Sequence, residues 1–353
     1  MTYSVHQHWD PLKVMAVGRS YPPEFYDYIK NEKVRKVFYK IAEETEEDYQ
    51  KLTNLLESFN VDVFRMPIDE LLAQANRQLT RGETIVPPYV MQPRDQSVMI
   101  GETFYCNDTA AYAPLREKVA SQGNIIKTNT DFDTGFKWQN QYNYLNGAQL
   151  SRLGKDLYIG TLEKVPDDKR NELIDTQRVL TNELSDYRLS FVETDGHNDG
   201  CFCPVIPGLI VSIVGSYQFK KTFPDWEVVY LVNESWGKVQ PFLELKKKNA
   251  GKWWVPGEEL NQDFTDYVET WMNKWVGYVE ESVFDVNMIV VDKKNVIVNG
   301  YNQKVFDAFS RHGITPHICN FRHRYFWDGG LHCITSDLHR EGVREDYFPD
   351  RNQ

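Results

Sequence analysis

Short runs of β-branched and aliphatic residues recur along the chain, and a glycine or a polar residue ends or closely follows each run. Runs of this length and composition are typical of buried strands. They lie at Val14–Arg19, Ser97–Thr103, Asp156–Thr161, Leu209–Ile213 and Asn287–Val291. The recurrence of one pattern along the whole chain predicts an internal structural repeat.

Segments rich in Glu, Lys, Arg and Leu follow most of these runs and have the composition of helices. The predicted helices are Val34–Ser58, Ala111–Gln122, Asp168–Ser185 and Gln303–His312. A further strand is expected after each helix, at Val61–Met66, Asn124–Lys127, Arg188–Val192 and Thr315–Cys319. Glu227–Val232 follows the fourth run with no clear helix in between. The repeating unit is therefore predicted to be a strand, a helix and a strand.

A unit of this kind cannot bury its apolar face alone, so the units should pack around a common centre. The pattern predicts an α/β fold, a five-bladed propeller with pseudo-fivefold repeats. No Pro-rich or Ser-rich linker interrupts the chain. We therefore expect one domain over residues 1–353.

Residues 218–282 depart from the repeat and are predicted to form an aromatic-rich insertion within that domain. The range contains Trp226, Trp236, Trp253, Trp254, Trp271 and Trp275. Within it, Phe264, Val268, Trp271, Trp275 and Tyr278 recur at helical spacing. We expect one aromatic helix face that packs on the domain or forms an interface.

Composition and charge restrict the class of protein. With 41% hydrophobic residues among 353, the chain can bury a substantial core. It has no apolar run of the roughly 18 residues that a membrane span needs, and Met1–Asp10 lacks a signal-peptide pattern. The net charge of −11 opposes nucleic-acid binding, and Lys246–Lys248 is interpreted as a solvated turn. We expect a cytoplasmic protein with neither a nucleic-acid nor a membrane partner.

The cysteines number five, an odd count without the spacing of a disulfide framework, so reduced thiols are expected. Cys333 ends the segment Asp328–Cys333, in which two glycines permit close backbone approach and leave amide donors beside the thiol. A nucleophile and a buried structural cysteine both fit this pattern. His332 is expected to point away from the thiol if the segment is a strand.

His197 and Asp199 alternate and can face one side of an extended chain, where they would form an acid/base pair. A polar loop is the alternative. A zinc site from His197, Cys201, Cys203 and the pair at 332–333 is disfavoured, because the two alternating cysteines fit a strand. The chain has no nucleotide-binding loop motif, so neither a metal nor a coenzyme is expected.

Four segments, which together span nearly the whole chain, resemble in content and in order those of the amidinotransferase family of the guanidino-group-modifying pentein superfamily. His8–Leu12 with the following run resembles the family's first strand, and Pro93–Asp95 with Gly101 resembles its second-unit carboxylate motif. His197-x-Asp199 with Pro207–Leu209 resembles its catalytic histidine motif. Gly329–Cys333 with Thr335 and Asp337 resembles its cysteine motif.

The resemblance implies covalent catalysis by Cys333, His197 and Asp199. The thiolate would attack a guanidinium carbon, His197 would protonate the departing amine, and an amidino-cysteine would remain. An amine acceptor then gives amidino transfer, and water gives hydrolysis. Asp95 and Asp199 would hold the substrate cation by charge-assisted hydrogen bonds, and Arg94 belongs to the same substrate-binding motif.

The chain departs from the family pattern at three implied substrate-binding positions. Gln149 stands where a carboxylate is expected, and a neutral amide should weaken substrate binding and histidine activation. Ser216 stands where an arginine would bind the donor's carboxylate, although Lys220 or Lys221 could substitute. Asp285, near the position of a substrate-contacting serine, would favour a diamine or polyamine.

Three function classes stay open: an amidinotransferase, a guanidino-group hydrolase, and a catalytically silent binder of guanidinium or amine. The whole-chain resemblance favours transfer. The partners it implies are a small guanidino donor and an amine acceptor. Members of the family often pair, so a homodimer is also implied, with the tryptophan-rich range as one candidate interface.

Overall fold

The computed structural model describes residues 1–69, 72–73, 91–128, 145–161, 170–194, 197–213, 219, 222–231, 255–272 and 284–351. Within these ranges the strands form five three-stranded sheets. The first sheet contains β15 (Thr335–Arg340), β1 (Leu12–Val17) and β2 (Asp62–Arg65). The second contains β3 (Ser97–Ile100), β4 (Thr103–Cys106) and β5 (Ile125–Thr128), and the third contains β6 (Leu150–Leu153), β7 (Asp156–Thr161) and β8 (Arg188–Glu193). The fourth contains β9 (Phe202–Ile206), β10 (Leu209–Ser212) and β11 (Glu227–Tyr230), and the fifth β12 (Ile289–Val290), β13 (Asn295–Val298) and β14 (Thr315–Ile318).

All of these sheets share one topology. The central strand pairs antiparallel with one neighbour and parallel with the other. In the first sheet the antiparallel neighbour is β15, which comes from the end of the chain, so this pairing joins the two ends of the described chain. The segment that carries Cys333 leads directly into β15.

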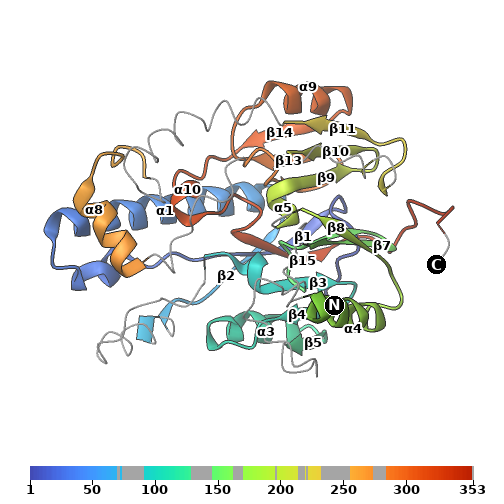
Figure 1. Ribbon diagram of the computed structural model, residues 1–353, viewed down its shortest axis with the longest axis horizontal. Helices are drawn as coiled ribbons and strands as arrows, with labels where there is room; N and C mark the ends of the chain where they lie inside the picture. The colour runs from blue at the N-terminus through green and yellow to red at the C-terminus, as the bar shows by residue number, and fades with distance from the viewer. Residues whose placement is uncertain are drawn as a thin grey trace.

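Helices connect the central strand to its parallel neighbour in four sheets: α1 (Glu32–Ser58), α3 (Ala113–Ala120), α4 (Arg170–Glu183) and α9 (Gln303–Arg311). The shorter helical segments are η1 (Pro23–Tyr28), η2 (Pro93–Gln96), η3 (Ala110–Tyr112), α5 (Asn198–Cys201), α8 (Gln262–Tyr267), η6 (Val268–Met272) and α10 (Arg324–Trp327). Figure 1 shows α1, α8 and α10 gathered to one side of the strands. None of the described helices combines the length and the apolar character that crossing a membrane requires.

The predicted outer strands and connecting helices agree with the observed ones to within a few residues, but the predicted unit lacked one strand. Ser97–Thr103 and Asn287–Val291 contain the first strand of a hairpin, not the strand that precedes the helix. The first hairpin turns at Gly101, which has a φ of +55°. The second turns at Asp292, whose carboxylate accepts from the backbone N–H of Lys294 and Asn295. The unit is therefore two strands, a helix and a strand.

Only part of the range 218–282 is described, and its extent as an insertion stays a prediction. Phe264 and Val268 are buried as predicted, and the Phe264 ring lies 5.2 Å from that of Phe38 in α1. Trp271 is 55% exposed and does not pack on the domain with them, so for this residue only the interface alternative stays a prediction. Residues 268–272 form a π-helical turn, which breaks the helical spacing on which that prediction relied. Trp275 and Tyr278 lie outside the described residues.

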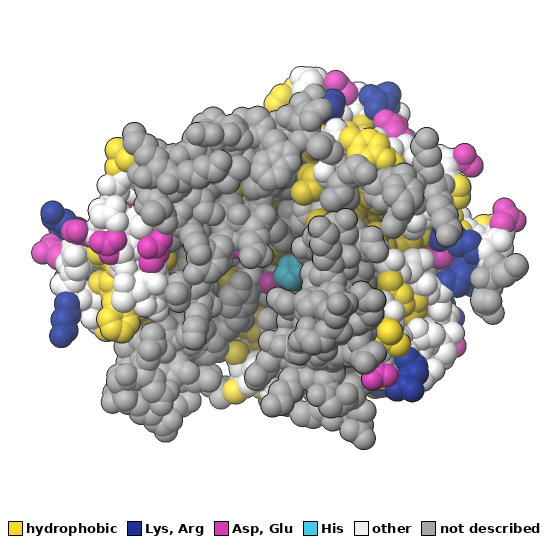
Figure 2. Space-filling view, in the orientation of Figure 1, with side chains coloured by type: hydrophobic (Ala, Val, Ile, Leu, Met, Phe, Trp, Pro, Cys, Tyr) yellow, Lys and Arg dark blue, Asp and Glu magenta, His cyan; other side chains and the backbone are white. Residues whose placement is uncertain are grey.

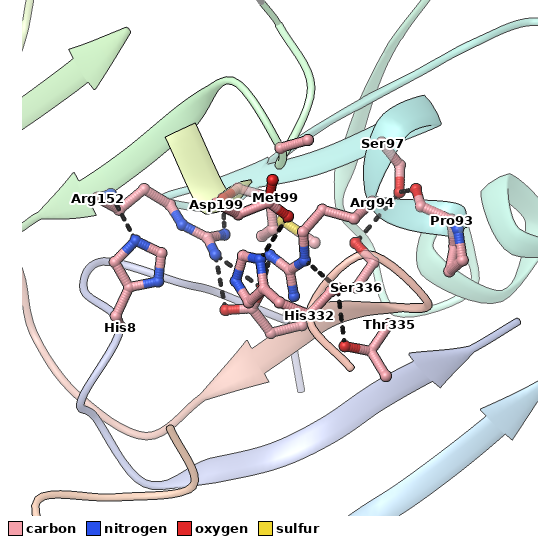
Figure 3. A network of polar contacts seen from close by, with 12 residues as sticks. His8, Pro93, Arg94, Ser97, Met99, Arg152, Asp199, His332, Thr335 and Ser336 are labelled. Carbon is pink, nitrogen blue, oxygen red and sulfur yellow. Dashed lines mark hydrogen bonds and ion pairs between the residues drawn. The ribbon is translucent and has the colours of Figure 1, made fainter. Parts of the chain in front are cut away.

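A buried ion cluster lies where three of the sheets meet. The carboxylate of Asp337 in β15 accepts from Arg152 of β6 at 2.7 Å, from Arg340 of β15 at 2.8 Å and from Arg94 of η2 at 3.1 Å. The arginines are at most 3% exposed and the carboxylate 1%. Burial alone would raise the pKa of Asp337, but the three guanidinium groups hold it well below its ordinary value. Figure 3 shows Arg94 and Arg152 directed into this cluster.

Replacing Asp337 with Asn should destabilise the protein by about 3 to 5 kcal/mol at neutral pH, because three buried cations lose their counter-ion. A depressed pKa stabilises the fold above the ordinary carboxyl range, and that stabilisation is lost only as pH falls through the depressed value. The difference in unfolding free energy between the wild type and Asp337→Asn should therefore shrink below about pH 4. Urea unfolding at several pH values measures it. Asp175→Asn, which removes an exposed pair with Arg178, is the control and should change little.

Candidate active site

Cys333 lies in a turn over residues 331–334, between α10 and β15. The glycines before it are needed for close packing. A Cβ on Gly330 would approach the side-chain oxygen of Asn287 to 2.6 Å, and one on Gly329 would collide with the amide nitrogen of Gln92. The turn therefore lies directly against the side-chain amides of Asn287 and Gln92, and only glycine allows that approach.

Asn287 positions the thiol. Its Nδ2 donates to Cys333 Sγ at 2.9 Å, and its Oδ1 accepts from the backbone N–H of His332 at 2.8 Å and of Cys333 at 3.3 Å. Asn287 is fully buried, and its own carbonyl accepts from Asn299 Nδ2 at 2.7 Å. An N–H donor aimed at sulfur favours the thiolate form, so this contact suits a nucleophile.

The expectation that His332 points away from the thiol is wrong, because residues 331–334 form a turn and not a strand. His332 Nδ1 lies 2.8 Å from Asp199 Oδ2, and the same oxygen lies 3.5 Å from Cys333 Sγ. Burial, with a further contribution from the Arg94 guanidinium, holds the pKa of His332 well below its ordinary value. A neutral His332 therefore orients the Asp199 carboxylate beside the thiol.

His197 and Asp199 do not lie on an extended chain as expected. Residues 198–201 form the short helix α5, and His197 occupies the position immediately before it. The helix is tied to the third sheet, since the N–H of Asp199 donates to the carbonyl of Ala148 at 3.2 Å. Through this local structure Asp199, from a distant segment, reaches Cys333.

Arg94 bonds to the protein itself. Its Nε donates to the carbonyl of His332 at 2.7 Å and its Nη1 to Asp337, so it anchors the turn that carries the thiol. Asp95 follows in η2 and is partly buried. Figure 3 shows Arg94 and His332 side by side in this network.

Of the remaining predicted substrate contacts, Gln149 lies beside the site, because the N–H of Asp199 donates to the carbonyl of the preceding residue, Ala148. Gln149 is 8% exposed and its backbone pairs with Gly160 of β7. Asp285 accepts from Asn302 Nδ2 at 3.1 Å, next to the beginning of α9. Ser216, Lys220 and Lys221 lie outside the described residues.

A cavity lies against the site. Its polar wall is made by His8, Arg94, Ser151, Asp199, His332 and Arg340, and mainly apolar residues line the rest. On the face drawn in Figure 2, a histidine and an acidic side chain are visible near the centre.

The five cysteines are free thiols, and their surroundings differ. Burial raises the pKa of Cys106 and of Cys203 to about 12 and that of Cys319 to about 11, which keeps these thiols protonated at neutral pH. Cys201 donates to the carbonyl of Thr194 at 3.2 Å. Cys333 has both an amide donor and a carboxylate at its sulfur. No group of three or more His, Cys, Asp or Glu that could hold a metal occurs in the described part of the chain.

Asn287 is the residue that sequence reasoning missed. It stood at the start of a predicted strand and was interpreted only as part of that strand. A signal was available, because a polar amide that opens an apolar run must find hydrogen-bond partners once buried. Nothing in the sequence, however, indicates that the partner is a thiol 46 residues away.

Asn287→Asp should make the Cys333 thiolate harder to form, because a carboxylate oxygen replaces the donor while the backbone contacts keep an acceptor. The pH at which iodoacetamide alkylates Cys333 at half its maximal rate should rise by about one unit or more. Peptide mapping by mass spectrometry measures it. Asn295→Asp, in β13 and bonded to Asp292, is the control and should leave that pH unchanged. An unchanged profile in Asn287→Asp would show that this amide does not tune the thiol.

The chain was compared with known proteins. No protein-family model matches it. It is 23% identical over 241 residues to the mitochondrial glycine amidinotransferase of Gallus gallus, a match that covers 66% of this chain and 44% of that protein. It is 21% identical over 236 residues to the L-arginine:L-lysine amidinotransferase of Pseudomonas savastanoi pv. phaseolicola, covering 66% of this chain and 52% of the relative. The match thus spans about half the length of these curated relatives.

The fold is similar over nearly the whole chain to two solved amidinotransferases. One, from the saxitoxin biosynthetic pathway of Microseira wollei, has a TM-score of 0.64 at 17% identity and covers 99% of this chain and 100% of its own. The other, the inosamine-phosphate amidinotransferase of Streptomyces griseus, has a TM-score of 0.63 at 17% identity, with 98% and 99% covered. In sequence and in fold, the chain is similar to the amidinotransferases of the pentein superfamily.

Proposed function

We propose that the protein transfers an amidino group from a guanidino donor to an amine acceptor through a covalent amidino-cysteine at Cys333. The observation that carries the proposal is the contact set of the thiol. An amide donor lies at 2.9 Å from the sulfur and a carboxylate oxygen at 3.5 Å, in a buried turn. The likeness to amidinotransferases supports the reaction class.

In the first half of the reaction, the Cys333 thiolate forms a C–S bond with the guanidinium carbon. The C–N bond to the leaving amine breaks, and His197 supplies the proton that the amine takes away. In the second half, the acceptor amine forms a new C–N bond and gives its proton to His197. The C–S bond then breaks and its electron pair returns to the sulfur, where Asn287 stabilises the charge.

The carboxylates hold the cationic donor in this proposal. Asp199, oriented by His332, and Asp95 would accept from the guanidinium by charge-assisted hydrogen bonds. Arg94 would act through the backbone of the nucleophile turn instead of through substrate. Asp285 and Ser216 would contact the end of the substrate that is remote from the guanidinium group, and Asp285 would favour a diamine or polyamine.

We further propose that the five sheets are the blades of one propeller. Their common topology supports this arrangement, as does the pairing of β15 with β1 between the two ends of the chain. The side chains that meet at Asp337 come from the first sheet, from the third sheet and from η2, which leads into the second sheet, as blades around one axis would allow. A homodimer and a cytoplasmic location stay predictions from the sequence.

Intact-mass spectrometry after mixing with arginine, agmatine or guanidinoacetate tests the proposed function. The wild-type protein should gain the mass of one amidino group, and Cys333→Ala should gain none. Cys201→Ala, which removes another buried thiol, is the control and should keep the adduct. Adding amines or only water to the adduct then separates a transferase from a hydrolase.

Gln149→Asp should increase the rate of adduct formation about tenfold or more, because a charge-assisted hydrogen bond replaces a neutral one. Single-turnover mass spectrometry measures that rate. Gln149→Asn, which shortens the side chain without adding charge, is the matched control and should give no increase. An adduct that forms only in Gln149→Asp would favour the silent binder over the enzyme, and no adduct in either protein would overturn the proposed function.

A further inference from the structure

Three side-chain oxygens converge in front of Gly160, in β7. A Cβ on this glycine would lie 2.5 Å from Gln149 Oε1, 2.5 Å from Asn198 Oδ1 and 2.9 Å from Thr194 Oγ1. We call these three oxygens the oxygen cradle. Any other side chain at this position would collide with these oxygens, so the cradle requires glycine here.

Two oxygens of the cradle are buried without a hydrogen-bond partner. Gln149 is 8% exposed and Asn198 is 1% exposed, and neither amide oxygen is bonded within the described residues. The orientation of Asn198 is fixed, since its Nδ2 donates to the carbonyl of Tyr158 at 3.0 Å. A buried acceptor without a partner is costly, so two that converge on one point indicate a ligand with N–H or O–H donors.

The cradle adjoins the proposed nucleophile. Asn198 directly precedes Asp199, whose carboxylate lies 3.5 Å from Cys333 Sγ. On the other side, the N–H of Asp199 donates to the carbonyl of Ala148, the residue before Gln149. A group bound in the cradle would therefore lie next to the site of the chemistry.

The three oxygens of the cradle carry no formal charge. The cradle should therefore bind a neutral amine in preference to a cationic N–H donor. A carboxylate favours the protonated amine, whereas burial without a counter-charge disfavours it. A neutral primary amine has two N–H groups, which match the two unpaired amide oxygens, and keeps its lone pair. The ionisable groups nearest in the chain are His197 and Asp199, which flank Asn198, and Cys201, which donates to the Thr194 carbonyl.

We propose that the oxygen cradle of Gln149, Asn198 and Thr194 binds the nitrogen of a primary amine, the acceptor class of this protein. The acceptor role rests on the proposed function, but the binding site does not. Bound in this way, an amine presents a free electron pair instead of a third N–H. Gln149 then serves amine binding where a carboxylate would retain the proton.

Methylamine labelled with ¹³C is the probe, titrated into the full chain and followed by NMR and by calorimetry. The wild-type protein should bind it saturably. Gly160→Ala, which fills the cradle, should weaken binding about tenfold or more. Gly300→Ala is the matched control, because a Cβ there meets nothing within 4 Å, and should bind like the wild type. Gln149→Leu removes one acceptor at similar volume and should also weaken binding, which covers the case of a Gly160→Ala protein that fails to fold.

The proposal is overturned if the wild-type protein shows no saturable binding, or if Gly160→Ala, folded, or Gln149→Leu binds as well as the wild type. Equal competition by potassium or tetramethylammonium would also overturn it, because neither ion donates an N–H. Cys333→Ala should still bind methylamine. Binding without an amidino adduct would therefore refute the proposed function alone, and an adduct without methylamine binding would refute the cradle alone.

Discussion

The buried carboxylate of Asp337 is the interaction on which the rest of the structure depends. It holds guanidinium groups from η2, β6 and β15, so one charge connects segments that are far apart in the sequence. Arg94 links the ion cluster to the turn that carries Cys333, because its Nε donates to the carbonyl of His332 in that turn. The ion cluster thereby fixes the turn at its backbone, and the glycines let that turn lie close to its neighbours. The hydrogen bonds of the ion cluster therefore both stabilise the fold and fix the geometry of the site.

The same charges set the chemistry of the site. Burial and the arginines keep His332 neutral, so it can hold Asp199 without adding a cation beside the thiol. In the proposed reaction, Asn287 would supply the donor that a thiolate needs, and Asp199 would bring negative charge for a cationic donor molecule. The cradle beside them is made of neutral oxygens. A charged side for a guanidinium and a neutral side for an amine fit a reaction in which one substrate must be a cation and the other must lose a proton.

Much of the fold could be predicted from the sequence, because the outer strands and helices show clear apolar periodicity. Two of the strands that the prediction lacked, β6 and β15, contain buried polar residues. Leu150–Leu153 contains Ser and Arg and resembles a loop, yet all four residues are buried because Arg152 pairs with Asp337 across sheets. The site shows the same limit: a motif located Cys333, but the roles of Asn287 and His332 depend on a turn and on contacts between distant segments, which local pattern does not encode.

The most direct measurement of the central claim is peptide mapping after treatment with chloroacetamidine, an electrophile whose amidinium group mimics a guanidinium. Labelling confined to Cys333, and slowed by a guanidino donor, is the expected result, because in the described part of the chain this thiol combines an amide donor with a carboxylate that can hold the cation. Labelling spread over the other four cysteines, or unaffected by any donor, would contradict the assignment of Cys333 as the nucleophile of a guanidinium-binding site.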